Sequence, residues 1–61
     1  MNEPVRFYAY VELDKSATPP LPLSVSLTRA AAREKIEEKA AAGQDVAQLR
    51  VRRAKVTTFE S

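Results

Sequence analysis

The clearest pattern in the chain is a strict alternation of apolar and polar residues that begins at Val5. Every second residue is apolar up to Leu13, and the residues between them are charged or amphipathic. Successive side chains of a β-strand point to opposite faces, so this period of two is typical of a strand with one buried face. The pattern therefore predicts a first strand from Val5 to Leu13.

A second alternating segment follows a loop. Asp14 to Pro20 is rich in Ser, Thr and Pro, which favour turns, and Leu21 to Leu27 then alternates apolar residues with small or polar ones. Pro22 lies inside this segment and has no backbone N–H to donate to a neighbouring strand. We therefore predict a second strand at an edge of the sheet.

Strong helix formers fill the stretch from Ala30 to Ala42. Thr28 is suited to cap this helix, because its hydroxyl can accept a hydrogen bond from an amide of the first turn. Gly43 is suited to end it in the left-handed conformation. Residues on one side of the predicted helix are small except for Ile36, so we expect the helix to lie close to a sheet.

A third alternating segment begins at Leu49, but its apolar positions change parity partway. Leu49 and Val51 are apolar at odd positions, whereas Ala54 and Val56 are apolar at even positions. One extra residue in a strand, a β-bulge, produces such a change. The pattern predicts a third strand with a bulge at its two adjacent arginines.

The order of these elements predicts an α+β fold in one small domain over residues 1–61. It is a ββαβ chain with a three-stranded sheet in strand order 2-1-3 and one helix packed on one face. The hairpin makes the first two strands antiparallel, and the helix returns the chain so that the third strand runs parallel to the second. The predicted core consists of the apolar strand positions and the helix anchor: Val5, Phe7, Ala9, Val11, Leu13, Leu21, Leu23, Val25, Leu27, Ile36, Leu49, Val51 and Val56.

The composition leaves such a domain short of stability. With 44% hydrophobic residues and a net charge of +2, the chain is too apolar for a disordered tail. A domain of about 60 residues nevertheless buries only about 60% of its unfolded surface. The chain has no Cys and no His, so neither disulfides nor an ordinary zinc site can stabilise it. Self-association remains, and we expect a homodimer.

The sequence contains little that supports catalysis. Ser24 and Ser26 have no histidine to activate them. Glu34 and Glu38 are one helical turn apart, but contacts with neighbouring Lys and Arg explain them better than a bound cation does. We therefore expect no enzymatic activity, no cofactor and no metal.

The expected location is the cytoplasm. The N-terminus lacks the basic and apolar regions of a secretory signal, and no apolar run approaches the ~20 residues that span a bilayer. We therefore expect no membrane contact.

A single helix covers only one face of a three-stranded sheet, so we expect the other face to be open. The alternation places tyrosines and arginines there, and most of the excess positive charge lies in the last strand. Tyrosine can stack on bases, and arginine can neutralise phosphates. The predicted interaction face comprises Arg6, Tyr8, Tyr10, Arg50, Arg52, Arg53 and Lys55.

Two functions remain open for this face. Tyrosine is common at protein interfaces, so the leading hypothesis is a non-catalytic protein-interaction module that acts through the open face or an edge strand. Its protein partner is unidentified. The alternative is a nucleic-acid-binding module that uses the same Tyr and Arg residues and the basic last strand, although a net charge of +2 is small for that role. Residues 19–22 also have the PxxP spacing that SH3 domains bind, but a stiff loop explains them better.

The layout as a whole, a short hairpin followed by a Thr-capped, Ala-rich helix and a final basic strand, resembles the small accessory proteins of phages and prophages. The resemblance covers the whole chain and is one of size and element order. It implies a non-enzymatic protein that binds a host or phage component.

Overall fold

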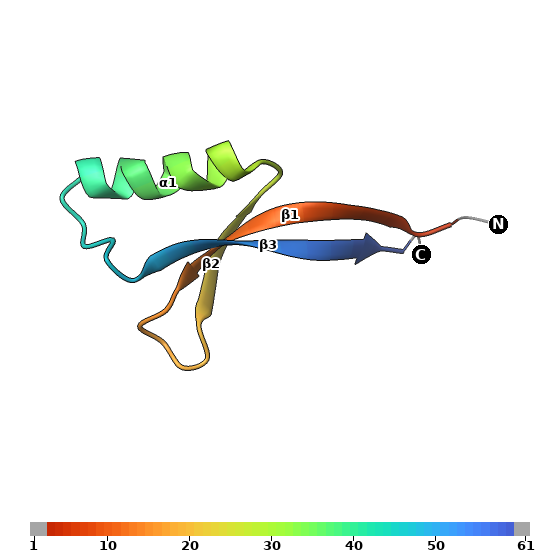
Figure 1. Cartoon of the computed structure of the whole chain (residues 1–61), viewed down its shortest axis with the longest axis horizontal. Helices are drawn as coiled ribbons and strands as arrows, with labels where there is room; N and C mark the ends of the chain where they lie inside the picture. Colours follow the sequence, from red (N-terminus) through yellow and green to blue (C-terminus); the bar gives the residue numbers. More distant parts are fainter. Residues whose placement is uncertain (1–2, 60–61) are drawn as a thin grey trace.

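A computed structural model describes residues 3–59 and contains four elements in the predicted order (Figure 1). They are β1 (Val5–Asp14), β2 (Leu21–Ser26), α1 (Arg29–Ala41) and β3 (Leu49–Thr58). The strands form one sheet in the order β2-β1-β3. The predicted α+β fold and the central position of the first strand are therefore confirmed.

The pairing of the strands also agrees with the sequence. β1 is antiparallel to both neighbours, so β2 and β3 run parallel to each other. β2 lies at an edge, where Pro22 costs no hydrogen bond to a third strand.

The two ends of α1 follow from single residues. The Thr28 hydroxyl accepts a hydrogen bond from the Ala31 backbone N–H at 3.1 Å, which caps the first turn. Gly43 has a φ of 84°, and its N–H donates to the Ala40 carbonyl at 3.0 Å. Glycine adopts this left-handed conformation without strain, so the helix ends where the sequence predicted.

The predicted bulge in the third strand is wrong. β3 pairs with β1 in an unbroken register from Val5 opposite Thr58 to Asp14 opposite Leu49. The register shift lies between β1 and β2 instead, where Glu12 pairs with Ser24 but Leu13 pairs with Pro22.

The parity change in β3 has another cause. Leu49 and Val51 pair with Asp14 and Glu12, and therefore lie on the same face of the sheet as these two residues. Val56 pairs with Phe7 and lies on the opposite face. The apolar residues of β3 thus move from one face to the other along a regular strand.

The helix packs on the opposite face of the sheet from the one that the alternation predicted. Lys39 of α1 forms an ion pair with Glu12 of β1, and the Arg29 guanidinium lies 5.1 Å from the centre of the Tyr10 ring. Tyr10 and Glu12 are two residues apart in one strand, so they share a face. The alternating apolar residues of β1 occupy the other face, which α1 leaves uncovered.

The core is correspondingly small. Within residues 3–59 the fully buried apolar side chains are Ala9 and Ala32, and the largest fully buried side chain is Glu12. Seven other members of the predicted core are half-buried, namely Phe7, Val11, Leu13, Ile36, Leu49, Val51 and Val56. The remaining five are exposed, namely Val5, Leu21, Leu23, Val25 and Leu27.

The molecule is elongated because β1 and β3 continue past the helix as a two-stranded ribbon (Figure 1). Its extents are 49 × 25 × 17 Å and its radius of gyration is 13.9 Å. A compact domain of this length has a radius of gyration of about 10–11 Å. No helix within residues 3–59 combines the length and apolar character needed to cross a membrane.

Candidate functional site

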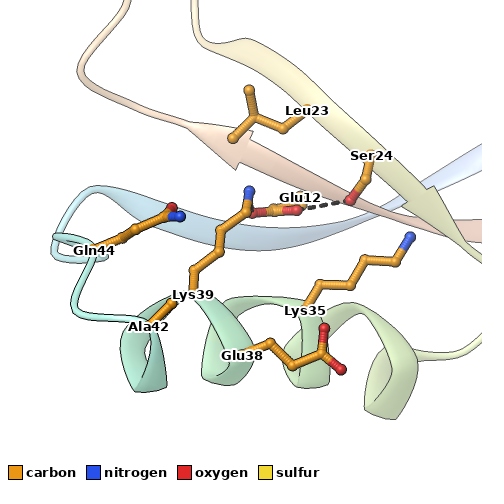
Figure 2. A pocket seen from close by; sticks show the side chains of 8 residues that line it. All are labelled: Glu12, Leu23, Ser24, Lys35, Glu38, Lys39, Ala42 and Gln44. Carbon is orange, nitrogen blue, oxygen red and sulfur yellow. Dashed lines mark hydrogen bonds and ion pairs between the residues drawn. The ribbon is translucent and has the colours of Figure 1, made fainter.

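Glu12 lies between the sheet and the helix and joins three elements (Figure 2). Its Oε1 accepts a hydrogen bond from the Ser24 hydroxyl of β2 at 2.7 Å, and its Oε2 accepts one from the Lys39 ammonium of α1 at 2.5 Å. The Glu12 side chain is only 1% exposed. A buried carboxylate of this kind is stable only when its oxygens are paired, and here both are.

The surroundings of Glu12 keep it ionised. Burial raises the pKa of its carboxyl, but the hydrogen bonds from Lys39 and Ser24, together with the charges of Lys39 and Lys35, outweigh that effect and lower the pKa below its ordinary value. A carboxylate that holds its charge and uses both oxygens is a poor general base. Its role in the geometry is to fix α1 on the sheet.

A shallow pocket of about 410 Å³ opens beside this cluster. Lys35 and Glu38 from α1, Leu23 from β2 and Gln44 after the helix lie around it (Figure 2). The charged groups are of both signs, and no group of three or more metal-ligating side chains occurs among the described residues. The pocket has no pair of groups arranged for acid–base or nucleophilic chemistry.

The seven residues of the predicted interaction face do not share one surface. Arg50 and Arg52 pair with Leu13 and Val11, so they lie on the uncovered apolar side of the sheet. The other five are on the face that carries α1, namely Arg6, Tyr8, Tyr10, Arg53 and Lys55. Sequence reasoning grouped all seven because it assumed a bulge in the third strand.

Four of these five residues form a surface on the ribbon, towards the end that extends past α1. Arg6, Tyr8, Arg53 and Lys55 occupy neighbouring positions of β1 and β3, and we call them the ribbon patch. The Arg53 guanidinium lies 4.6 Å from the centre of the Tyr8 ring, and Tyr8 is 52% exposed. Tyr10 is set apart, because the helix residue Arg29 lies against its ring.

The opposite side of the sheet is an apolar surface, which we call the apolar face. Its exposed members are Val5 and Val25, and its half-buried members are Phe7, Val11, Leu13, Ala54 and Val56, whereas Ala9 lies on the same side but is fully buried. Val5 and Val25 are 61% and 60% exposed. Sequence reasoning placed most of these residues in the core, and so it missed this surface.

One signal in the sequence points to this outcome. The side of α1 that meets the sheet carries Ala32, Lys35, Ile36 and Lys39, of which Ile36 alone is a large apolar residue. Such a side cannot cover a row of valines and a phenylalanine, but its lysines suit Glu12.

Comparison of the chain with protein families, with curated proteins and with solved structures found no match.

Proposed function

We propose that this protein is a non-catalytic protein-interaction module that works as a homodimer, with two copies packed through their apolar faces. The observation that supports this most directly is the uncovered apolar face, because exposed apolar patches of this kind mark interaction sites. The resemblance in layout to phage accessory proteins agrees with a binding role.

The surface area of the chain fits a second copy as the occupant. The molecule exposes 4929 Å², whereas a compact monomer of this size exposes about 4,000 Å². The ribbon of β1 and β3 contributes to this excess, whose size is comparable to the ~800 Å² that each partner contributes to an interface of ordinary size. Two sheets that pack face to face bury such surfaces between them.

A two-fold arrangement also avoids a clash of charge. The members of the apolar face are uncharged, and Arg50 and Arg52 of β3 lie directly beside Leu13 and Val11 in one half of it. A two-fold axis perpendicular to β1 places these arginines at opposite ends of the dimer. The same patch then serves both copies, as an isologous interface requires.

The sheet edges are less suitable for self-association. β2 has six residues and contains Pro22, which limits pairing with a further strand. Two β3 edges would bring together strands that each carry three arginines and one lysine. Like charges opposite each other destabilise a strand pair.

Sedimentation equilibrium over a range of concentrations tests the dimer. We expect the wild-type chain to be dimeric and Val25→Glu to weaken dimerisation by at least about a hundredfold, because a buried, unpaired charge costs several kcal/mol. Val25 is exposed in the single chain, so the substitution leaves the monomer fold intact.

Tyr8→Glu is the matched control, since Tyr8 is similarly exposed but lies on the other face. It should dimerise like the wild type. A wild-type chain that stays monomeric at high concentration and melts cooperatively would contradict the proposal, as would a fully dimeric Val25→Glu variant.

A second candidate function rests on the ribbon patch. Its three cations and the exposed Tyr8 ring together suit a nucleic-acid strand, with phosphates on the cations and a base on the ring. Fluorescence anisotropy with short single-stranded and duplex oligonucleotides should then give affinities that fall steeply with salt. Tyr8→Ser should weaken single-strand binding by about tenfold, since stacking of one base contributes about 1–3 kcal/mol. No binding at low salt would contradict this function.

A further inference from the structure

A second pocket opens where β1, β3 and the loop after β1 meet, and we call it the basic pocket. Its volume is about 440 Å³, and it is lined by Leu13, Lys15, Pro20, Arg50, Val51 and Arg52. Three of these six residues are cationic and none is acidic. The volume lies within the range of about 300–1,000 Å³ that is common for ligand pockets.

Backbone pairing brings the three cations together. Arg50 and Arg52 are two residues apart in β3, opposite Leu13 and Val11, so they share a face of the sheet. The Lys15 backbone N–H donates to the Gln48 carbonyl at 2.9 Å, which extends the pairing beyond the strand ends. The pairing of β1 with β3 therefore places the three positive charges near one another.

The Arg50 guanidinium is held in one orientation. Its Nη1 donates to the carbonyls of Ala47 and Leu49, at 2.8 and 2.9 Å. A guanidinium has five N–H donors, so Nε and Nη2 keep three for other acceptors. An Nε–Nη2 edge matches the two oxygens of a carboxylate, and an arginine that is already fixed loses little entropy on binding.

The positive charge of the pocket is not neutralised within the described part of the chain. The ion pair within residues 3–59 is that of Lys39 with Glu12, on the other face of the sheet. Asp14 is next to Lys15 in sequence, but its Oδ1 accepts hydrogen bonds from the backbone N–H and the hydroxyl of Ser16. Lys15, Arg50 and Arg52 have no carboxylate within 4.0 Å among these residues.

We propose that the basic pocket binds a short acidic peptide segment of a partner protein. A carboxylate side chain of the segment pairs with Arg50 and Arg52, and a neighbouring aliphatic side chain packs on Pro20, which lies outside the apolar face. This mixture of cations and apolar surface suits a peptide better than a nucleic acid, because no aromatic ring lines the pocket. The inference rests on the proposed function, since it names the partner chemistry of the interaction module, but it does not require the dimer.

Peptide binding tests the chemistry of the pocket. The probe is a fluorescein-labelled peptide of alternating Leu and Glu, compared by anisotropy with the same peptide carrying Gln in place of Glu. We expect the Glu peptide to bind at least about tenfold more tightly, because hydrogen bonds to charged groups contribute about 1.5–3 kcal/mol. Equal binding of the two peptides would overturn the inference.

Single substitutions locate the binding. Arg52→Gln and Lys15→Gln should each weaken binding of the Glu peptide by about tenfold. Arg33→Gln removes the same charge from an exposed position of α1 and should leave the affinity within about twofold. An equal loss with Arg33→Gln would show a general attraction of charge and contradict a defined site. Displacement of the peptide by oligo-dT at a lower concentration than by unlabelled peptide would assign the pocket to nucleic acid instead.

The same titration on Val5→Glu separates the two proposals, because Val5 is an exposed member of the apolar face at the far end of β1 from the pocket, so this variant should weaken the dimer without placing a charge near Arg52. Peptide binding by this variant supports the basic pocket whatever the oligomeric state, whereas sedimentation alone reports on the dimer. A dimer that does not bind the Glu peptide would overturn the inference and leave the self-association intact.

Discussion

At the scale of single residues, Glu12 is the unusual feature of this protein. It occupies the position between helix and sheet where a small domain ordinarily places a large apolar side chain. Its oxygens are paired with Ser24 and Lys39 from two other elements. Removal of one partner of a buried pair leaves a charge that neither water nor protein compensates. The attachment of α1 therefore depends in part on this carboxylate.

The pH dependence of stability should reflect this carboxylate. The folded-state pKa of Glu12 lies below its ordinary value of 4.5, so its contribution is complete above that value and is lost as the pH falls through the folded-state pKa. Denaturant unfolding monitored by circular dichroism should show stability falling as the pH is lowered below about 4.5. Glu12→Gln should lose about 2 kcal/mol or more at pH 7 and show a weaker fall in acid.

Asp14 provides the comparison for this experiment. Its pKa is also lowered, by hydrogen bonds from the Ser16 hydroxyl and backbone N–H, but its side chain is only half-buried, whereas that of Glu12 is fully buried. Asp14→Asn should therefore change stability at pH 7 far less than Glu12→Gln. If both substitutions lowered stability equally at pH 7, burial of the carboxylate would not explain the contribution of Glu12.

At the scale of elements, α1 packs closely on the sheet through small residues. Ala32 is fully buried and lies in the first turn of α1. The caps at Thr28 and Gly43 determine where the helix begins and ends, but contacts at Ala32 and the Glu12 ion pair determine how it packs on the sheet. A helix with one large apolar anchor contributes little burial of its own.

A larger residue at position 32 should disturb this packing. Ala32→Leu inserts a side chain where none fits, and overpacking of this kind costs about 1–3 kcal/mol. Ala30→Leu makes the same change at an exposed position of the first turn and should alter the free energy of unfolding by less than about 0.5 kcal/mol. Denaturant unfolding of both variants checks the difference, and equal stabilities would mean that the helix lies further from the sheet.

At the scale of the whole molecule, more large apolar side chains are exposed than are fully buried. Ala9 and Ala32 are the fully buried apolar residues of the described chain, while Val5, Val25, Leu27 and other large apolar side chains are exposed. Folding entropy costs about 1–2 kcal/mol per residue for the backbone alone, so a single chain with so small a core should have a low free energy of unfolding. Under the proposed function, association with a second copy would bury more of this apolar surface.

The midpoint of thermal unfolding should therefore depend on protein concentration. Because a dimer dissociates as it unfolds, mass action raises the midpoint as concentration increases. Calorimetry over a hundredfold range of concentration should show this for the wild type and not for Val25→Glu. A concentration-independent midpoint in the wild type would indicate that the single chain is stable alone.

Local properties of the chain were sufficient to predict its elements and their order. Strand alternation, the proline in the second strand, the Thr28 cap and the Gly43 terminus each act over a few residues, and the structure agrees with all of them. The α+β fold and the order β2-β1-β3 follow from these elements and from the shortness of the hairpin loop.

The tertiary structure decided which face of the sheet the helix covers. That choice depends on how well the inner side of α1, with Lys35 and Lys39, fits each of the two faces of β1. No pattern within one segment of the chain contains this information. The register of β3 depends in the same way on its pairing with β1, and it separates Arg50 and Arg52 from the ribbon patch. Alternation identifies which face of a strand is apolar. Whether that face is buried depends on which other elements of the chain pack on it. Here Lys39 of the helix pairs with Glu12, and the helix leaves the apolar face of the sheet uncovered.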